Sequence, residues 1–203
     1  MQLIGYMDSP YVRRVAVTAQ LLDIPYEHRE LSVFRDYDAL RKINPQAKVP
    51  TLVCDDGQIL MDSSLIIDYL VARSGGATLM PVEGKDFVRA LYILGTALVT
   101  MEKTVQLIYE MKHRPEATRY PDWVARLEQQ LNGALAMLEE AVGDGNSWLF
   151  GDELTQADVS TAIAWPFTQL HFPNFAEARH YPGLVRFSAR AEALSAFQAC
   201  PVE

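Results

Sequence analysis

Residues 48–64 read KVPTLVCDDGQILMDSS, and this stretch carries the clearest local signals in the chain. Two short apolar runs, 51–54 and 58–61, are separated by the turn residues 55–57, and an Asp-Gly turn between such runs is typical of a β-hairpin. The Asp-Ser-Ser sequence at 62–64 then supplies N-cap chemistry for a helix. The stretch therefore predicts two antiparallel strands followed by a helix.

Upstream of the hairpin the pattern alternates between strand and helix. Residues 2–6 form a compact apolar run, and Ser9 followed by Pro10 is typical of a helix start. Residues 26–31 have the alternation of a second strand, and 36–43 form a short helical candidate. Together with the hairpin, this predicts a βαβ unit, a connecting helix and a ββα unit.

Strand signals stop after about residue 75, and every later periodic segment is helical. Residues 75–84 mix glycine, proline and small side chains, as an interdomain connection does. Thr155 and Asp158 stand at the N-cap and N3 positions of a helix, in an acidic variant of the capping box. The sequence predicts an α/β domain over about 1–78 and an all-α domain over about 84–203, with helices at 87–113, 122–142, from 156, and at 183–194.

Composition limits the kind of partner that the chain can have. Its 203 residues are 49% hydrophobic and 22% charged, as in ordinary globular proteins, and the net charge of -8 disfavours nucleic acid and anionic membranes. The longest charge-free stretch, 159–176, contains two prolines and several polar residues, so we do not expect it to span a membrane. The first residues lack the pattern of a secretory signal, and we therefore expect a cytoplasmic protein.

The cysteines and histidines carry no metal or redox motif. The chain has two cysteines, and they are too far apart for a C-x-x-C pair, so neither a disulfide framework nor a cysteine zinc site is predicted. The four histidines share no metal-ligand spacing. We expect Cys54 to be a small buried side chain. We expect no metal site at any of the cysteines and histidines, which are Cys54, Cys200, His28, His113, His171 and His180.

Four separated motifs resemble one family. The segments 9–14 (SPYVRR), 44–50 (NPQAKVP) and 62–70 (DSSLIIDYL) resemble the N-terminal domain of cytosolic glutathione S-transferases, and the capping element 155–158 resembles the C-terminal domain of the same family. The order of the motifs and their span over nearly the whole chain make this resemblance specific. It implies a thioredoxin-like domain that binds glutathione and a helical domain that shapes a pocket for a second substrate. The chain resembles a bacterial member with serine at the catalytic position.

The resemblance also implies a glutathione site. Val49-Pro50 would be a cis peptide, with the Val49 backbone paired to the extended tripeptide, and Lys48 would meet the glycyl carboxylate. Asp62 and Ser63 would hold the γ-glutamyl group at the helix N-terminus, where free N–H groups and the helix dipole favour a carboxylate. The family more often has glutamate where this chain has Asp62, which leaves the role of that side chain open. The alternatives are a trans proline, a solvated lysine and a simple cap.

Ser9 is the residue on which the predicted chemistry depends. A thiol of pKa about 8.5 is about 3% ionised at pH 7, and lowering its pKa by two units requires about 2.7 kcal/mol. A helix N-terminus supplies about 0.3 to 1 kcal/mol and a hydrogen bond to a charged acceptor about 1.5 to 3 kcal/mol, so the two together suffice. Ser9 offers both. The alternatives are that Tyr6, Tyr11 or a backbone N–H stabilises the sulfur and that Ser9 is only an N-cap.

The resemblance implies a detoxifying glutathione transferase, in which bound glutathione thiolate attacks a hydrophobic electrophile. Glutathione is the co-substrate and no other cofactor is expected; the family also implies a homodimer. The rivals are a non-catalytic interaction or regulatory module and a glutathione-dependent peroxidase, reductase or isomerase. Aromatic and methionine residues at helical spacing more often belong to a core than to a pocket. The candidates for the second-substrate pocket are Phe34, Met101, Val105, Ile108, Tyr109 and Trp165.

Overall fold

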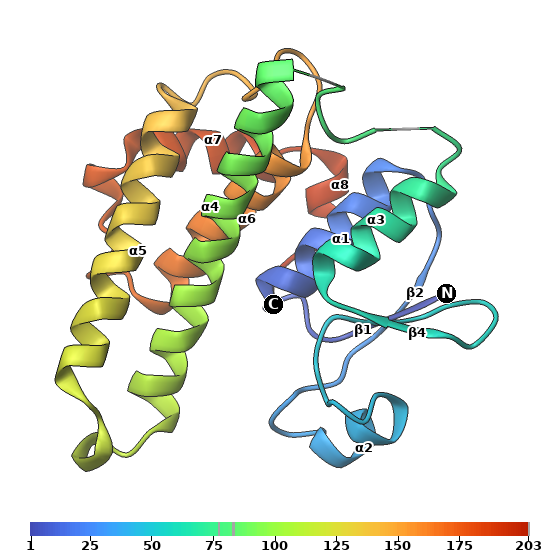
Figure 1. Ribbon diagram of the computed structural model, residues 1–203, viewed down its shortest axis with the longest axis horizontal. Helices are drawn as coiled ribbons and strands as arrows, with labels where there is room; N and C mark the ends of the chain where they lie inside the picture. The colour runs from blue at the N-terminus through green and yellow to red at the C-terminus, as the bar shows by residue number, and fades with distance from the viewer. Residues whose placement is uncertain (77, 83, 203) are drawn as a thin grey trace. The chain divides into compact units, whose positions relative to one another are not determined.

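The computed structural model describes residues 1–76, 78–82 and 84–202, and the chain forms two compact units. Unit 1 comprises Met1–Leu79 with Ala193–Glu203, and unit 2 comprises Met80–Glu192. Figure 1 shows the sheet and its helices in unit 1 and the long helices of unit 2. The predicted α/β and all-α parts are therefore both present.

Unit 1 is built on a four-stranded mixed sheet of order β2-β1-β3-β4. β1 (Gln2–Ile4) pairs in parallel with β2 (Glu27–Arg29) and antiparallel with β3 (Thr51–Val53), and β3 pairs antiparallel with β4 (Ile59–Met61). This is the βαβ and ββα order that the sequence predicts.

Helices cover the two faces of this sheet. α1 (Pro10–Leu21) and α3 (Ser63–Arg73) pack against each other on one face, and α2 (Tyr37–Ile43) lies on the other, as Figure 1 shows. Leu40 of α2 is fully buried with Ile4 of β1, and half-buried aliphatic side chains close the cluster around them. The face that carries α1 and α3 brings two helix N-termini into one layer.

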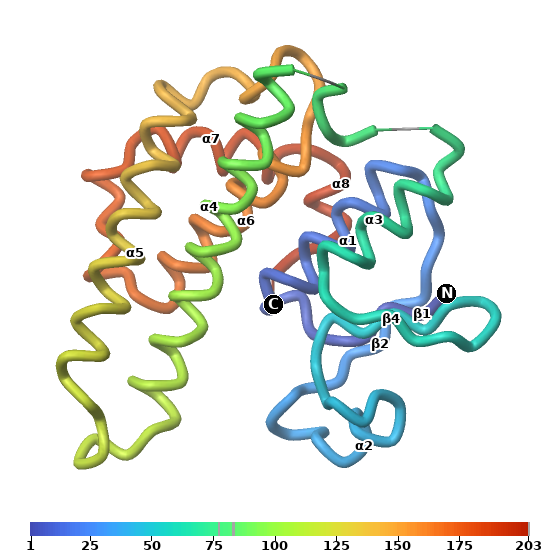
Figure 2. Tube along the Cα trace, viewed as in Figure 1, coloured from blue at the N-terminus to red at the C-terminus, as the bar shows by residue number. Residues whose placement is uncertain are grey.

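The last segment of the chain belongs to unit 1, whereas the sequence analysis placed all of 84–203 in the helical domain. α8 (Ser195–Gln198) lies beside α1, as the red end of the trace in Figure 2 shows. The reason is a pair of buried contacts: Arg13 Nε donates to the Cys200 carbonyl at 2.9 Å, and the Arg13 guanidinium lies 5.7 Å from the centroid of the Phe197 ring. Phe197 is fully buried there.

Unit 2 is helical throughout its regular segments. α4 (Gly84–Ile108) packs against both α5 (Pro121–Val142) and α6 (Gln156–His171), and α7 (Pro182–Glu192) packs against α5 and α6. The predicted helix at 87–113 starts earlier than expected and ends in a π-helical turn, η1 (Tyr109–His113). Two short 3-10 turns, η2 (Glu116–Thr118) and η3 (Ala178–His180), complete the unit.

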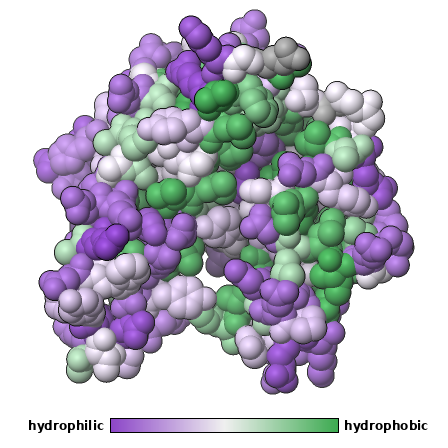
Figure 3. Space-filling model, in the orientation of Figure 1, coloured by the Kyte–Doolittle hydropathy of each residue, from purple (hydrophilic) through white to green (hydrophobic). Residues whose placement is uncertain are grey.

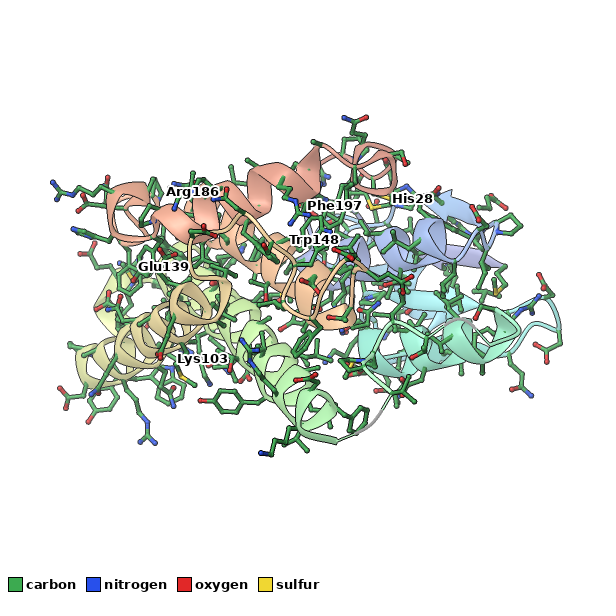
Figure 4. All side chains as sticks on the ribbon, turned by 90° about the horizontal axis from the view of Figure 1, so that it is seen from above. His28, Lys103, Glu139, Trp148, Arg186 and Phe197 are labelled. Atoms are coloured by element: carbon green, nitrogen blue, oxygen red, sulfur yellow. The ribbon has the colours of Figure 1, made fainter. Side chains whose placement is uncertain are left out.

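Two buried or half-buried carboxylates organise the connections of unit 2. Asp158 is fully buried and accepts hydrogen bonds from the N–H groups of Leu149 and Thr155, each at 2.8 Å, which completes the predicted capping box. Burial raises the pKa of Asp158, and these hydrogen bonds oppose the rise. Glu139 of α5 accepts hydrogen bonds from the N–H groups of Gly183 and Leu184 and so holds the start of α7. Figure 4 labels Glu139 of α5 and Arg186 of α7.

The stretch 84–113 is long and apolar enough to cross a membrane by length and composition, and 39% of its most apolar window is buried within the protein. Helices in the core of globular proteins pass the same test. Because α4 packs against both α5 and α6, it is the central helix of unit 2.

Candidate functional site

The N-terminus of α1 presents Ser9. Its backbone is extended, with φ of -74° and ψ of 120°, and its N–H donates to the Tyr6 carbonyl at 3.1 Å. The Ser9 hydroxyl oxygen accepts from the Val12 N–H at 3.4 Å, so Ser9 is the predicted N-cap. Within the described part of the chain, no group accepts the proton of this half-buried hydroxyl.

The loop that contains Val49 meets the start of α1. The Val49-Pro50 peptide is cis, as the resemblance implied. Gly5 lies between the two segments with φ of 132°, and a Cβ at Gly5 would stand 2.5 Å from Val12 Cγ2 and 2.9 Å from Val49 Cβ. Only glycine therefore lets the loop approach α1 this closely.

The Val49 backbone is available to a ligand. Among the residues that the structure describes, none makes a hydrogen bond with the Val49 N–H or carbonyl, although Thr51 nearby pairs with β1 and β4. Unpaired backbone groups beside a strand can pair with an extended peptide. Lys48 is exposed in the same loop, where its carbonyl accepts from the Thr51 hydroxyl at 2.6 Å.

The N-terminus of α3 carries Asp62 and Ser63. Asp62 has φ of 69° and ψ of 122°, a conformation that non-glycine residues rarely adopt, and such backbone outliers cluster at functional sites. Asp62 Oδ1 accepts from the Ser64 N–H at 2.8 Å, and its Oδ2 makes no hydrogen bond to a described residue. Ser63 is buried just behind this exposed carboxylate.

Arg14 connects these segments, and the sequence analysis did not find it. Its guanidinium is buried at 1% exposure, and Nη1 donates to Ser63 Oγ at 2.9 Å and to Ser64 Oγ at 3.0 Å. Arg14 follows Ser9 by about one and a half turns of α1. The available signal was an arginine three and four residues before Val17 and Thr18, on one face of α1, and both of these residues are buried.

The two tyrosines near Ser9 remain alternatives for the thiolate contact. Tyr6 is half-buried, and the Arg35 guanidinium lies 5.2 Å from its ring centroid. Tyr11 is also half-buried, and its proximity is one of the influences that raise the pKa of Arg14 against the effect of burial. Neither tyrosine lies within a strand, since β1 ends at Ile4.

The predicted second-substrate residues divide into two groups. Met101 and Trp165 are buried at 0% and 2% exposure, and the Trp165 ring packs on Tyr181 with centroids 5.3 Å apart. Both pack in the core of unit 2 and expose almost no surface, as expected for core residues, so their place in a pocket stays a prediction. The others stay predictions: Phe34 and Tyr109 are exposed, and Val105 and Ile108 are half-buried.

The cysteines and histidines have structural surroundings. Cys54 and Cys200 are buried and free, and burial raises the pKa of the Cys200 thiol. His28 Nε2 lies 2.7 Å from the Gly5 carbonyl, and His171 Nδ1 lies 3.1 Å from Lys112 Nζ. No cluster of three potential metal ligands occurs among the described residues.

A thioredoxin-like domain joined to a helical domain defines the class of protein, and comparison with known families agrees. Residues 3–78 match the model of the glutathione S-transferase N-terminal domain, and residues 121–197 match that of the glutathione S-transferase C-terminal domain. The chain therefore belongs to the glutathione S-transferase superfamily.

Solved structures support this assignment over the full chain. A glutathione S-transferase from Methylobacterium radiotolerans, in complex with glutathione sulfonate, has a TM-score of 0.89 at 26% identity. The match covers 98% of this chain and 93% of the chain of that structure. A glutathione transferase family member from Pseudomonas fluorescens, with bound glutathione, has a TM-score of 0.84 at 28% identity over 100% and 98%.

Curated relatives include proteins of known and unknown activity. The maleylacetoacetate isomerase of Pseudomonas aeruginosa is 28% identical over 78% of this chain and 77% of its own length. An uncharacterized GST-like protein of Escherichia coli, YibF, is 26% identical over 81% and 80%.

Proposed function

We propose that this chain is a glutathione transferase in which Ser9 stabilises the thiolate of bound glutathione. The observation that carries the proposal is the Ser9 hydroxyl at the start of α1, whose proton has no acceptor among the described residues. Near it, unit 1 offers the unpaired Val49 backbone and the N-terminus of α3. In this proposal the Val49 backbone binds the cysteinyl backbone of glutathione, the N-terminus of α3 binds its γ-glutamyl carboxylate, and Ser9 binds its thiol.

Each part of glutathione has a counterpart in unit 1. The cysteinyl backbone would pair with the Val49 N–H and carbonyl, and the α-carboxylate of the γ-glutamyl group would accept from Ser63 and the first N–H groups of α3. Asp62 Oδ2 would take the ammonium group, while Oδ1 remains with the Ser64 N–H. The exposed Lys48 would pair with the glycyl carboxylate.

The Ser9 hydroxyl proton has no acceptor among the described residues, whereas the backbone at Ser9, Pro10 and Val12 offers no free N–H to the sulfur. The Ser9 N–H is used by the Tyr6 carbonyl, Pro10 has no N–H, and the Val12 N–H points to Ser9 Oγ. The glutathione thiol loses its proton to water, and its sulfur then forms a bond to the electrophilic carbon. The electron pair leaves with a departing group or, in an addition, is protonated by water. Ser9 donates a hydrogen bond throughout and forms no covalent bond.

Ser63→Ala is expected to weaken glutathione binding by about 0.5 to 1.5 kcal/mol, the typical net value of one hydrogen bond. Calorimetric titration measures this change directly. Ser74→Ala is the matched control, because its hydroxyl donates to the Val71 carbonyl at the far end of α3. Unchanged affinity in Ser63→Ala would place the γ-glutamyl group elsewhere.

A glutathione-dependent isomerase is the second candidate, favoured by the similarity to maleylacetoacetate isomerase. The two activities differ in what happens to glutathione, because a transferase consumes one thiol per product and an isomerase releases the thiol unchanged. We expect thiol loss equal to product formed with hydrophobic electrophiles. Isomerisation of a cis-alkene diacid without thiol loss would favour the isomerase, and glutathione binding without turnover of any substrate would favour the non-catalytic module.

We further propose a homodimer through the outer face of α4. Val88, Tyr92 and Val99 recur at helical spacing and are 66%, 61% and 37% exposed, although the opposite face of the same helix is buried. Figure 3 shows apolar side chains gathered over this helix. A second copy with two-fold symmetry would cover the same face on both subunits.

Light scattering at micromolar concentration should give twice the 22.8 kDa mass of the chain. Val88→Glu should shift the protein to the monomer, because the substitution places a charge at the most exposed of the three apolar positions on this face. Gln129→Glu adds the same charge at an exposed position of α5 and should leave the mass unchanged. A wild-type protein with the mass of one chain would rule the dimer out.

The proposed activity fits the cytoplasm. Cys54 and Cys200 are both free, as is usual where glutathione keeps thiols reduced. We place the protein in that compartment on this ground and on its proposed use of glutathione.

A further inference from the structure

Arg14 is a fully charged side chain inside the layer formed by α1 and α3. It is 1% exposed, and burial lowers its pKa to about 10 while Asp62, Tyr11 and Asp68 act in the opposite direction. The side chain is therefore still protonated at neutral pH. Burying a charge is costly, and an aliphatic residue would join two helices more cheaply.

The hydrogen bonds of Arg14 determine how Ser63 can act. A guanidinium has donors and no acceptor, so the oxygens of Ser63 and Ser64 both accept from it at 2.9 and 3.0 Å. The hydroxyl proton of Ser63 must then point away from Arg14, toward another acceptor. The arginine also places a positive charge behind the N-terminus of α3, whose free N–H groups already favour an anion.

We propose that Arg14 is a positioning residue for glutathione: it orients the Ser63 hydroxyl as a donor to the γ-glutamyl α-carboxylate and adds fixed positive charge behind that group. The inference rests on the proposed function, since it assumes that glutathione binds at the N-terminus of α3. Because Arg14 and Ser9 are carried by the same helix, α1 aligns the carboxylate and thiolate ends of one ligand.

The test compares two ligands in the full-length protein by calorimetry. Glutathione carries the α-carboxylate, and γ-aminobutyryl-cysteinyl-glycine is the same peptide without it. In Arg14→Met, glutathione binding should weaken by about tenfold or more, while binding of the shorter ligand stays within about twofold, because the lost interaction is a charge-assisted one with the missing group. The ratio of the two affinities should therefore fall by about tenfold.

Arg13→Met is the matched control, because Arg13 is also buried in α1 but holds Cys200 and Phe197 of the C-terminal segment. It should lower thermal stability and leave the affinity ratio at the wild-type value. Should Arg14→Met not fold, Arg14→Lys decides by the same ratio, which should fall by several-fold because an ammonium keeps the charge without the guanidinium geometry.

Two outcomes overturn different statements. An unchanged affinity ratio in a folded Arg14 variant would show that Arg14 only fills space between the helices. A wild type that binds neither ligand would overturn the proposed function itself.

Discussion

Ser9→Ala is expected to raise the pKa of the bound glutathione thiol by about one to two units, because about 1.5 to 3 kcal/mol of hydrogen bonding to the thiolate is lost. Glutathione affinity should change little, since the carboxylate and backbone contacts lie at Val49 and α3. Transfer activity at pH 7 should fall by about three- to twenty-five-fold, in proportion to the ionised fraction, and should recover partly in alkali. Ultraviolet absorbance of the bound thiolate against pH measures the shift.

Tyr6→Phe and Tyr11→Phe are the matched controls for this substitution, because each removes the hydroxyl of a tyrosine close to Ser9 in the sequence and keeps its ring. If the pKa of the bound thiol shifts only in a tyrosine variant, the thiolate contact belongs to that tyrosine and Ser9 is only an N-cap. A titration that moves in none of the three would assign the contact to a backbone N–H.

Asp158→Ala is expected to lower the free energy of unfolding more than any other substitution proposed for this protein. The fully buried carboxylate accepts from Leu149 N–H, Thr155 N–H and the Thr155 hydroxyl, at 2.8, 2.8 and 2.6 Å. Each donor left without a partner costs about 1 to 3 kcal/mol, so the loss of all three bonds should lower the free energy of unfolding by about 3 to 9 kcal/mol. That is a large share of the stability of a typical domain.

Urea unfolding followed by far-ultraviolet circular dichroism measures this loss, because α6 and its neighbours give most of the helical signal. Asp152→Ala is the control, since Asp152 is exposed in the loop before the same helix. Equal urea midpoints for the two variants would mean that the capping box contributes nothing to the fold.

The strands and the helix starts could be predicted from the sequence because their signals are local. The turn at 55–57 fixes the hairpin, Ser9-Pro10 starts α1, and Thr155 with Asp158 starts α6, each within a few residues of chain. The candidate site consists largely of these same termini. Its residues on unit 1 could therefore be proposed before their arrangement was known.

The remaining features depend on contacts between distant residues. Nothing near Ser195 indicates that α8 packs on α1, since the contact requires Arg13 from the other end of the chain. In the same way, the role of Arg14 requires Ser63, which lies 49 residues away. The burial of Met101 and Trp165 also depends on packing, because apolar residues at helical spacing have the same sequence pattern in a core and in a pocket.

The central claim is that unit 1 binds glutathione and ionises its thiol. It is tested most directly by following thiolate absorbance against pH in the wild-type protein saturated with glutathione. We predict a pKa about two units below the ordinary thiol value of about 8.5, so that most of the bound thiol is ionised at pH 7. A bound thiol that titrates at the pKa of free glutathione would contradict this account.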